Sequence, residues 1–225
     1  MQLALATAGL VPALNAGPVP VPRLRPDGAE TGARRRFEAE EEIYAEGDRV
    51  IHFYKVVSGA VRTYRLLSDG RRQIDGFHLP GDIFGLEAGT ERRTGADAVI
   101  DTTLTAYRRN DRDALTDEVG ALAQEVVAAM LRALERAQDH MMLLGRKSAK
   151  ERVASFLLAL AERAGTEGLI ALPMSRADIA DHLGLTIESV SRTLTQLERD
   201  GVIALQAQRR SVVVQDMPAL RRLEG

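Results

Sequence analysis

The residues of this chain with the most distinctive chemistry are Ile187, Glu188, Ser191 and Arg192. An Arg side chain can donate two hydrogen bonds to O6 and N7 of guanine, a Glu can accept one from N4 of cytosine, and an Ile can contact the methyl group of thymine. Glu188 and Arg192 are four residues apart, so on a helix they share one face. Together these residue types have the chemistry of a surface that reads base pairs in the major groove of DNA. The alternative is an exposed ion pair between two turns of a helix.

The residues around this face predict a helix-turn-helix. Ser175 and Asp178 have the spacing of a capping box and predict the start of a first helix. Gly184 provides the backbone freedom that a sharp turn needs, and Thr186 is the expected N-cap of a second helix, which Gly201 ends. Helix-turn-helix proteins place the first turns of the second helix on base edges, which favours DNA reading over an ion pair. The expected buried face of that helix consists of Val190, Leu194 and Leu197.

Contacts to the DNA backbone are expected from polar and basic residues near this face. The β-rich runs 202–205 and 211–214 predict a hairpin, or wing, with two arginines at its tip. The alternative for these arginines is an ordinary solvated charge. The full set of expected phosphate contacts is Ser175, Arg176, Thr186, Ser189, Thr193, Arg209 and Arg210.

The segment 184–194, GLTIESVSRTL, resembles the recognition helix of the CRP/FNR family of transcription factors. Glu188-x-x-Ser191-Arg192 is the form of the motif in the FNR and FixK branches, and Ile187 stands where the cyclic-AMP branch has a further Arg. The resemblance covers about residues 37–223. It implies a homodimeric transcription regulator, expected to be an activator, that binds double-stranded DNA at a TTGA…TCAA palindrome and works with RNA polymerase.

Residues 37–110 are expected to form a β domain, because turn motifs separate short apolar runs at intervals of about 8–12 residues. Asp69-Gly70 predicts a hairpin between 61–67 and 72–79. The family resemblance implies an α+β fold. Its parts are an N-terminal jelly roll (double-stranded β-helix), a long dimerisation helix and a C-terminal winged helix-turn-helix domain over 146–225.

Residues 111–145 have helical periodicity. Such a helix either lies on the β domain and buries its apolar stripe within the monomer, or pairs with a second copy as a coiled coil. The length of the stripe and its small alanines favour the dimer. The predicted dimerisation residues are Leu115, Val119, Leu122, Val126, Met130, Ala133, Ala137 and Met141.

The remaining composition excludes several classes of protein. No apolar run reaches the roughly 18 residues of a membrane span, and residues 1–36, which are rich in proline, are expected to be a flexible leader. Zero cysteines exclude disulfides and thiolate metal sites and fit a cytoplasmic protein. The net charge of −2 does not decide for or against DNA binding.

No cofactor, metal site or enzyme activity is expected. The cyclic-AMP branch holds the ribose with a Gly-Glu pair, but here Leu86 follows Gly85, and Arg93-Thr94 come after a shorter loop. A buried hydroxyl without a partner costs about 1–3 kcal/mol, so cyclic AMP is not expected. His78 is interpreted as structural, and the His-x-His pair of a metal-binding cupin is absent.

The absence of cysteine also excludes the iron–sulfur cluster of the FNR branch. The chain is therefore most similar to the FixK group, which implies control of low-oxygen respiration or nitrogen fixation. The alternative is a sensor of the same fold whose β domain must bind a cyclic nucleotide or haem before the protein binds DNA.

Overall fold

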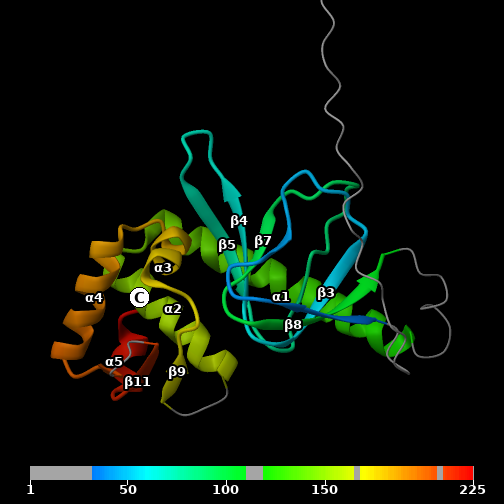
Figure 1. The fold of residues 1–225 in the computed structure, drawn as a ribbon. Coiled ribbons are helices and arrows are strands. Elements are labelled where there is room, and N and C mark those ends of the chain that lie inside the picture. Colours follow the sequence, from blue (N-terminus) through cyan, green and yellow to red (C-terminus); the bar gives the residue numbers. More distant parts are fainter. Residues whose placement is uncertain (1–31, 110–118, 165–167, 207–209, 225) are drawn as a thin grey trace, which may run out of the picture.

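The computed structural model describes residues 32–109, 119–164, 168–206 and 210–224. Its N-terminal part is a β domain of two antiparallel sheets, with strand orders β1-β8-β3-β6 and β2-β7-β4-β5 (Figure 1). Tyr54, Val61 and Leu104 are buried between these sheets. The strands are β1 (Ala33–Phe37), β2 (Glu42–Tyr44), β3 (His52–Ser58), β4 (Val61–Leu66), β5 (Arg72–His78), β6 (Ile83–Phe84), β7 (Gly95–Ala98) and β8 (Thr102–Arg108). The predicted jelly roll and the α+β class are confirmed.

The predicted hairpin is formed by β4 and β5, which project from the domain (Figure 1). Gly70 has φ 84°, a left-handed conformation that glycine adopts without a steric penalty. The pairing brings Arg62 opposite Phe77 and Arg65 opposite Gln73. This hairpin matters for function because β5 also contacts the C-terminal domain.

The β domain begins before residue 37. β1 starts at Ala33 and pairs with β8, so residues 33–36 belong to the β domain and not to the predicted leader. The basic residues Arg34, Arg35 and Arg36, which fall at the end of the predicted leader, therefore lie on a strand. Charged side chains do not prevent the backbone from pairing, and they are common on edge strands, where they discourage pairing with other chains.

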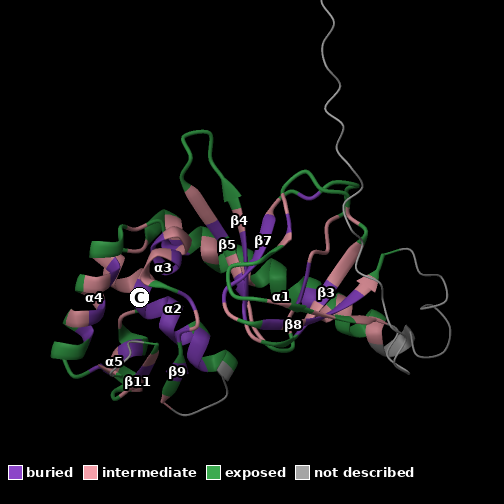
Figure 2. Cartoon of the chain, in the orientation of Figure 1, coloured by how far each residue is buried: buried purple, intermediate pink, exposed green. Residues whose placement is uncertain are grey.

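Helix α1 (Val119–Arg146) lies along the β domain (Figure 1). Ala129 and Leu143 are buried on its inner face, and Glu125 on this helix forms an ion pair with Lys55 at 2.6 Å. The outer face carries exposed apolar side chains, and parts of α1 are coloured as exposed in Figure 2. Its large side chains are Val127, Met130, Leu131, Leu134, Met141 and Met142.

The predicted dimerisation stripe is divided between these two faces. Among its members, Leu122 and Val126 are half-buried. The mean spacing of all the predicted dimerisation residues exceeds 3.6 residues, so from its first to its last residue the stripe drifts by roughly 80° around the helix. Leu115 and the side chain of Val119 lie outside the described residues. The exposed members are Met130, Ala133, Ala137 and Met141.

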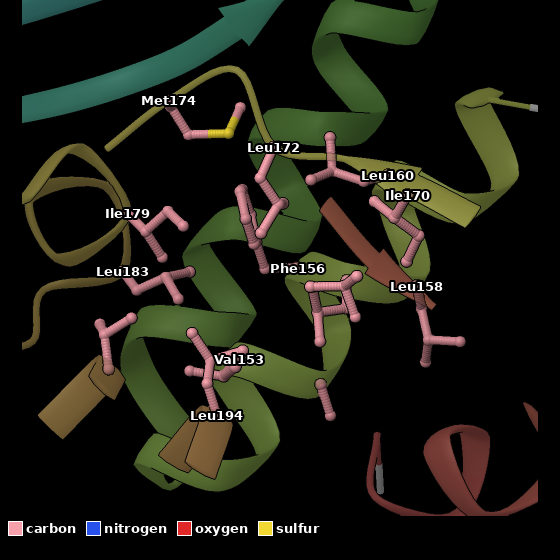
Figure 3. Packing of buried hydrophobic residues seen from close by; sticks show 14 of the residues in the cluster. Val153, Phe156, Leu158, Leu160, Ile170, Leu172, Met174, Ile179, Leu183 and Leu194 are labelled. Carbon is pink, nitrogen blue, oxygen red and sulfur yellow. The ribbon is translucent and has the colours of Figure 1, made fainter. Parts of the chain in front are cut away.

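The C-terminal part packs four helices and a small sheet around one apolar core (Figure 3). A capping box starts α2, because the backbone N–H of Ser148 donates to Glu151 Oε2 at 2.6 Å and the N–H of Glu151 donates to the Ser148 hydroxyl at 3.4 Å. β9 and α5 were not predicted, since three and six residues are too few for a periodic pattern. The elements are α2 (Ala149–Ala164), β9 (Leu169–Ala171), α3 (Arg176–Leu183), α4 (Ile187–Arg199), β10 (Ile203–Leu205), β11 (Ser211–Val214) and α5 (Met217–Arg222). Within the described ranges, no helix has both the length and the apolar character that crossing a membrane requires.

Candidate nucleic-acid interface

The helix-turn-helix is formed by α3 and α4, and its local contacts are those that the sequence predicts. The hydroxyl of Ser175 accepts a hydrogen bond from the backbone N–H of Asp178 at 3.1 Å, and the Asp178 carboxylate accepts one from the N–H of Ser175 at 3.0 Å. Gly184 is left-handed, with φ 61° and ψ 42°. Thr186 caps α4 by accepting a hydrogen bond from the N–H of Ser189 at 3.2 Å. The buried face of α4 consists of Val190, Leu194 and Leu197.

The opposite face of α4 presents the predicted base-reading residues. Ile187 is 48% exposed, Glu188 and Arg192 are exposed, and Ser191 is half-buried. Arg192 Nε donates to the backbone carbonyl of Glu188 at 3.4 Å, a long hydrogen bond. The capping contacts at the start of α4, first of all the backbone N–H of Glu188 itself and then Thr186, hold the pKa of Glu188 below its usual range. An ionised acceptor and a cationic donor are therefore both open to a partner at neutral pH.

The predicted phosphate contacts are distributed over α4, the wing and the start of α3. Thr186, Ser189 and Thr193 lie on α4 near the base-reading face. Arg210 is exposed directly before β11, in the predicted wing formed by β10 and β11. Arg209 lies outside the described residues.

The remaining two phosphate candidates lie at the start of α3. The hydroxyl of Ser175 also donates to Asp178 Oδ2 at 2.7 Å, so the capping box uses it both as donor and as acceptor. Arg176, the first residue of α3, is half-buried.

The comparisons with known proteins agree with this geometry. A cyclic nucleotide-binding domain model matches residues 34–118, and a Crp-like helix-turn-helix domain model matches residues 151–223. The nitrogen fixation regulation protein FixK of Azorhizobium caulinodans is 47% identical over 202 residues, which are 88% of this chain and 81% of that protein. FixK of Rhizobium meliloti is 46% identical over 187 residues, which cover 83% of this chain and 85% of that protein.

The solved structure of FixK2 from Bradyrhizobium japonicum has a TM-score of 0.79 and 45% sequence identity, and the match covers 86% of this chain and 98% of that one. The chain belongs to the CRP/FNR family, in its FixK-like branch. CRP/FNR proteins are DNA-binding transcription regulators, so the expectation that this chain is not an enzyme is confirmed. A CooA mutant from Carboxydothermus hydrogenoformans, 23% identical with a TM-score of 0.72, shares the fold.

The β domain of this CRP/FNR protein contains a cavity of about 420 Å³, lined among others by Leu86, Glu87, Arg93 and Thr94. The side chain of Leu86 has no group that accepts a hydrogen bond from a sugar hydroxyl. The next carboxylate, Glu87, forms an ion pair at 2.5 Å with Arg92, which is 4% exposed. The cavity is therefore present, but Glu87, one of the two acidic side chains that line it along with Asp75, is already paired with Arg92.

His78 also lines this cavity, and its contacts are structural. Its Nε2 lies 3.1 Å from the hydroxyl of Thr63, and its ring stacks on Phe84 with 4.8 Å between the centroids. Burial lowers the pKa of His78 to about 4, so the ring is neutral at pH 7. Among the described residues, no three His, Cys, Asp or Glu side chains are grouped so that they can hold a metal ion.

Proposed function

We propose that this protein is a homodimeric transcription activator that reads a TTGA…TCAA palindrome without cyclic AMP and controls low-oxygen or nitrogen-fixation genes. The observation that carries the proposal is the exposed face of α4, where Ile187, Glu188 and Arg192 emerge from a helix that is buried on its other side. The names of the relatives support the class of genes, since two of them are nitrogen fixation regulation proteins. AadR of Rhodopseudomonas palustris, 40% identical over 174 residues, is a transcriptional activatory protein.

Each side chain on this face has a proposed partner on the half-site. Arg192 donates two hydrogen bonds to O6 and N7 of the guanine in TTGA, and Glu188 accepts one from N4 of the paired cytosine or from the adjacent adenine. Ile187 and Ser191 lie toward the thymines, where Ile187 contacts a methyl group. Thr186, Ser189, Thr193 and Arg210 are the proposed phosphate contacts around this face, with Ser175, Arg176 and Arg209 as further candidates.

The outer face of α1 supports a dimer. Val127, Leu134 and Met141 recur every seven residues, and each is at least 56% exposed in this chain. A heptad of apolar residues is the pattern by which two helices pack as a coiled coil. Two copies joined in this way would present two recognition helices to successive major grooves, about 34 Å apart, which requires a palindromic site. An activator also acts on RNA polymerase, which is the second expected partner.

The residues at the cavity support the proposed independence from cyclic AMP. Leu86 replaces an acceptor for the ribose, and Glu87 is paired with Arg92. The second candidate function is an effector-dependent regulator of the same fold, which the cavity of about 420 Å³ favours, because it has the size of a small-molecule site. Calorimetry with cyclic AMP and cyclic GMP separates the two, and a visible spectrum of the purified protein tests for haem. Micromolar binding or a Soret band would support the second candidate.

The main experiment is a selection from random oligonucleotides with the purified, ligand-free protein. The expected result is enrichment of a palindrome with TTGA and TCAA half-sites at one fixed spacing. Adding cyclic AMP is expected to change neither the sequence nor the affinity. Enrichment of an unrelated or non-palindromic sequence would contradict the proposed site, and enrichment only with a nucleotide present would favour the effector-dependent alternative.

A further inference from the structure

A buried carboxylate joins the DNA-binding domain to the β domain. Asp178 is the third residue of α3, and its side chain is 4% exposed. Its Oδ2 accepts hydrogen bonds from the backbone N–H and the hydroxyl of Ser175, at 3.0 and 2.7 Å. Its Oδ1 accepts hydrogen bonds from Arg62 Nη1 at 3.1 Å and from Arg72 Nη2 at 2.6 Å. One side chain therefore caps α3 and also ties it to strands β4 and β5.

The contacts continue along the same face of α3. Arg72 Nε donates to Asp181 Oδ2 at 3.0 Å, and Gln73 Nε2 donates to the carbonyl oxygen of His182 at 3.3 Å. The ring Nδ1 of His182 lies 3.1 Å from the carbonyl oxygen of Ile74. Three consecutive residues of β5 thus contact positions three and four apart on α3, which are neighbours on one helix face. The helix cannot roll about its axis without breaking several of these hydrogen bonds.

Burial makes this junction costly to open. The side chain of Arg62 is 5% exposed and also contacts Asp97 Oδ2 at 3.0 Å and Glu40 Oε2 at 2.5 Å. Separating the two domains would break the ion pair between Arg62 and Asp178 while both side chains stay partly buried. Breaking a buried pair in this way is far less favourable than breaking an exposed one, because the remaining charge has lost its hydration.

A second attachment holds the other end of α3. Arg152 on α2 donates through Nη1 to the carbonyl oxygen of Leu183 at 2.9 Å and through Nη2 to that of Leu144 at 3.0 Å. Leu183 is the last residue of α3, and Leu144 lies near the end of α1. α3 is therefore held at both ends, and α4 follows it because Leu183 and Leu194 belong to the same buried core. The direction of the recognition helix is thereby set relative to α1.

We propose that Arg72, acting through Asp178 and Asp181, is a positioning residue that makes the dimer selective for the spacing between its two half-sites. This inference rests on the proposed function, because it requires two copies that read one palindrome. Each inserted base pair moves the second half-site by about 3.4 Å along the DNA and rotates it by roughly 35°. Recognition helices that are held rigidly to α1 cannot follow this movement, whereas helices on a loosened domain can.

The first test compares binding to palindromes whose spacer is the optimum, one base pair shorter, and one or two base pairs longer. For the natural protein we expect at least about a tenfold loss of affinity for one inserted base pair. The ratio of the affinities for the optimal and the lengthened spacer is expected to be about three- to tenfold smaller in Arg72→Gln. Arg72→Lys is expected to restore part of this ratio. Asp181→Asn, which removes only one partner of Arg72, should act in the same direction but less. A merely structural role would weaken binding to all spacers alike and leave the ratio unchanged.

Arg71→Gln is the matched control. Arg71 is the neighbouring residue and undergoes the same chemical change, but its side chain is 77% exposed and pairs with Asp69 in the hairpin turn. This variant is expected to keep the full spacing ratio of the natural protein.

The second test measures the junction without DNA. The chain contains no cysteine, so spin labels can be placed at Val57→Cys on β3 and Arg199→Cys on α4 without a background. Labelled copies are diluted with unlabelled ones, so that only distances within one chain are read. We expect one narrow distance distribution for the natural protein and for Arg71→Gln, and a broader one for Arg72→Gln.

The outcomes separate the two proposals. If the natural protein shows no dependence on spacing, both the proposed function and this inference are overturned. If it is selective and Arg72→Gln is equally selective, or if the distance distribution of Arg72→Gln stays narrow, the inference falls and the proposed function stands. A broadened distribution with an unchanged spacing ratio also overturns the inference.

Discussion

Two sets of carboxylate and guanidinium groups, one on α4 and one between α3 and the β domain, have the same chemistry and opposite surroundings. On α4, Glu188 and Arg192 are exposed, and the hydrogen bond between Arg192 Nε and the Glu188 backbone is 3.4 Å long. On α3, Asp178 is almost completely buried and receives hydrogen bonds from Arg62 and Arg72 at 3.1 and 2.6 Å. The first set is free to exchange its contacts for a base pair, whereas the second holds two domains together.

The difference between the two sets is one of desolvation. An exposed pair contributes about 0–1 kcal/mol, so little is lost when its members turn to DNA. A buried pair has already given up its water, and removing one member leaves a charge without a partner at a cost of about 3–5 kcal/mol. The type of residue therefore does not tell whether a charge recognises a ligand or positions a domain.

The largest effect is expected from Arg62→Leu. It removes the buried cation that Asp97 and Asp178 share and leaves Asp178 with Arg72 alone, so the free energy of unfolding should fall by about 3–5 kcal/mol. Urea denaturation measures this change. Arg71→Leu, on the exposed hairpin turn, should change it by less than about 0.5 kcal/mol. Equal losses of unfolding free energy in the two variants would contradict the expected difference between buried and exposed charges.

Low pH is expected to weaken the contact between α3 and β5, where His182 lies. Burial lowers the pKa of His182 to about 4, whereas an unfolded His titrates near 6.5. Between these values the unfolded chain binds more protons than the folded one, so the free energy of unfolding falls as the pH falls from about 6.5 toward 4. His182 alone should contribute a loss of about 2–3 kcal/mol at pH 4.5. Urea denaturation at several pH values should show a shallower pH dependence for His182→Gln than for the natural protein.

Arg192→Ala is expected to affect DNA binding and not folding. Loss of the two hydrogen bonds to guanine should cost about 1–3 kcal/mol per half-site and relax the preference at that G·C pair, with unchanged urea stability. Arg199→Ala is the matched control, since Arg199 is exposed in the last turn of the same helix. Affinities for the TTGA palindrome and for variants of its G·C pair provide the measurement, and a retained guanine preference would refute the assigned role.

The smallest effect is expected from Arg210→Ala. An exposed arginine that contacts a phosphate contributes equally to every DNA sequence, so affinity should fall slightly without a change of specificity. The slope of log affinity against log salt should become shallower by about one per arginine lost. Arg221→Ala, an exposed arginine on α5, should leave the slope unchanged. Equal slopes for Arg210→Ala and the natural protein would exclude the phosphate contact.

Local sequence patterns predicted the helix-turn-helix well. Ser175, Asp178, Gly184 and Thr186 act on backbone groups within four residues of themselves, so their spacing alone indicates the caps and the turn. The hairpin around Asp69-Gly70 was predictable for the same reason. The jelly roll and the class of regulator came from the family resemblance, because the order of the strands depends on pairings that are distant in the sequence.

Other features were not predictable from a local pattern. The apolar residues of α1 lie on two faces, one that packs on the β domain and one that is exposed. The predicted dimerisation residues therefore include members of both faces. Arg62 lies in a strand whose sequence pattern is that of any β-strand. Nothing in this pattern indicates that Arg62 pairs with Asp178, which is 116 residues away.

The sequence by itself determined where α3 and α4 begin and end and which residues of α4 face outward, because helical spacing and caps act within one or two turns. Only the tertiary structure decided which charges are available to a partner. Desolvation depends on what packs around a side chain, and β5 reaches α3 only after both domains have folded and docked.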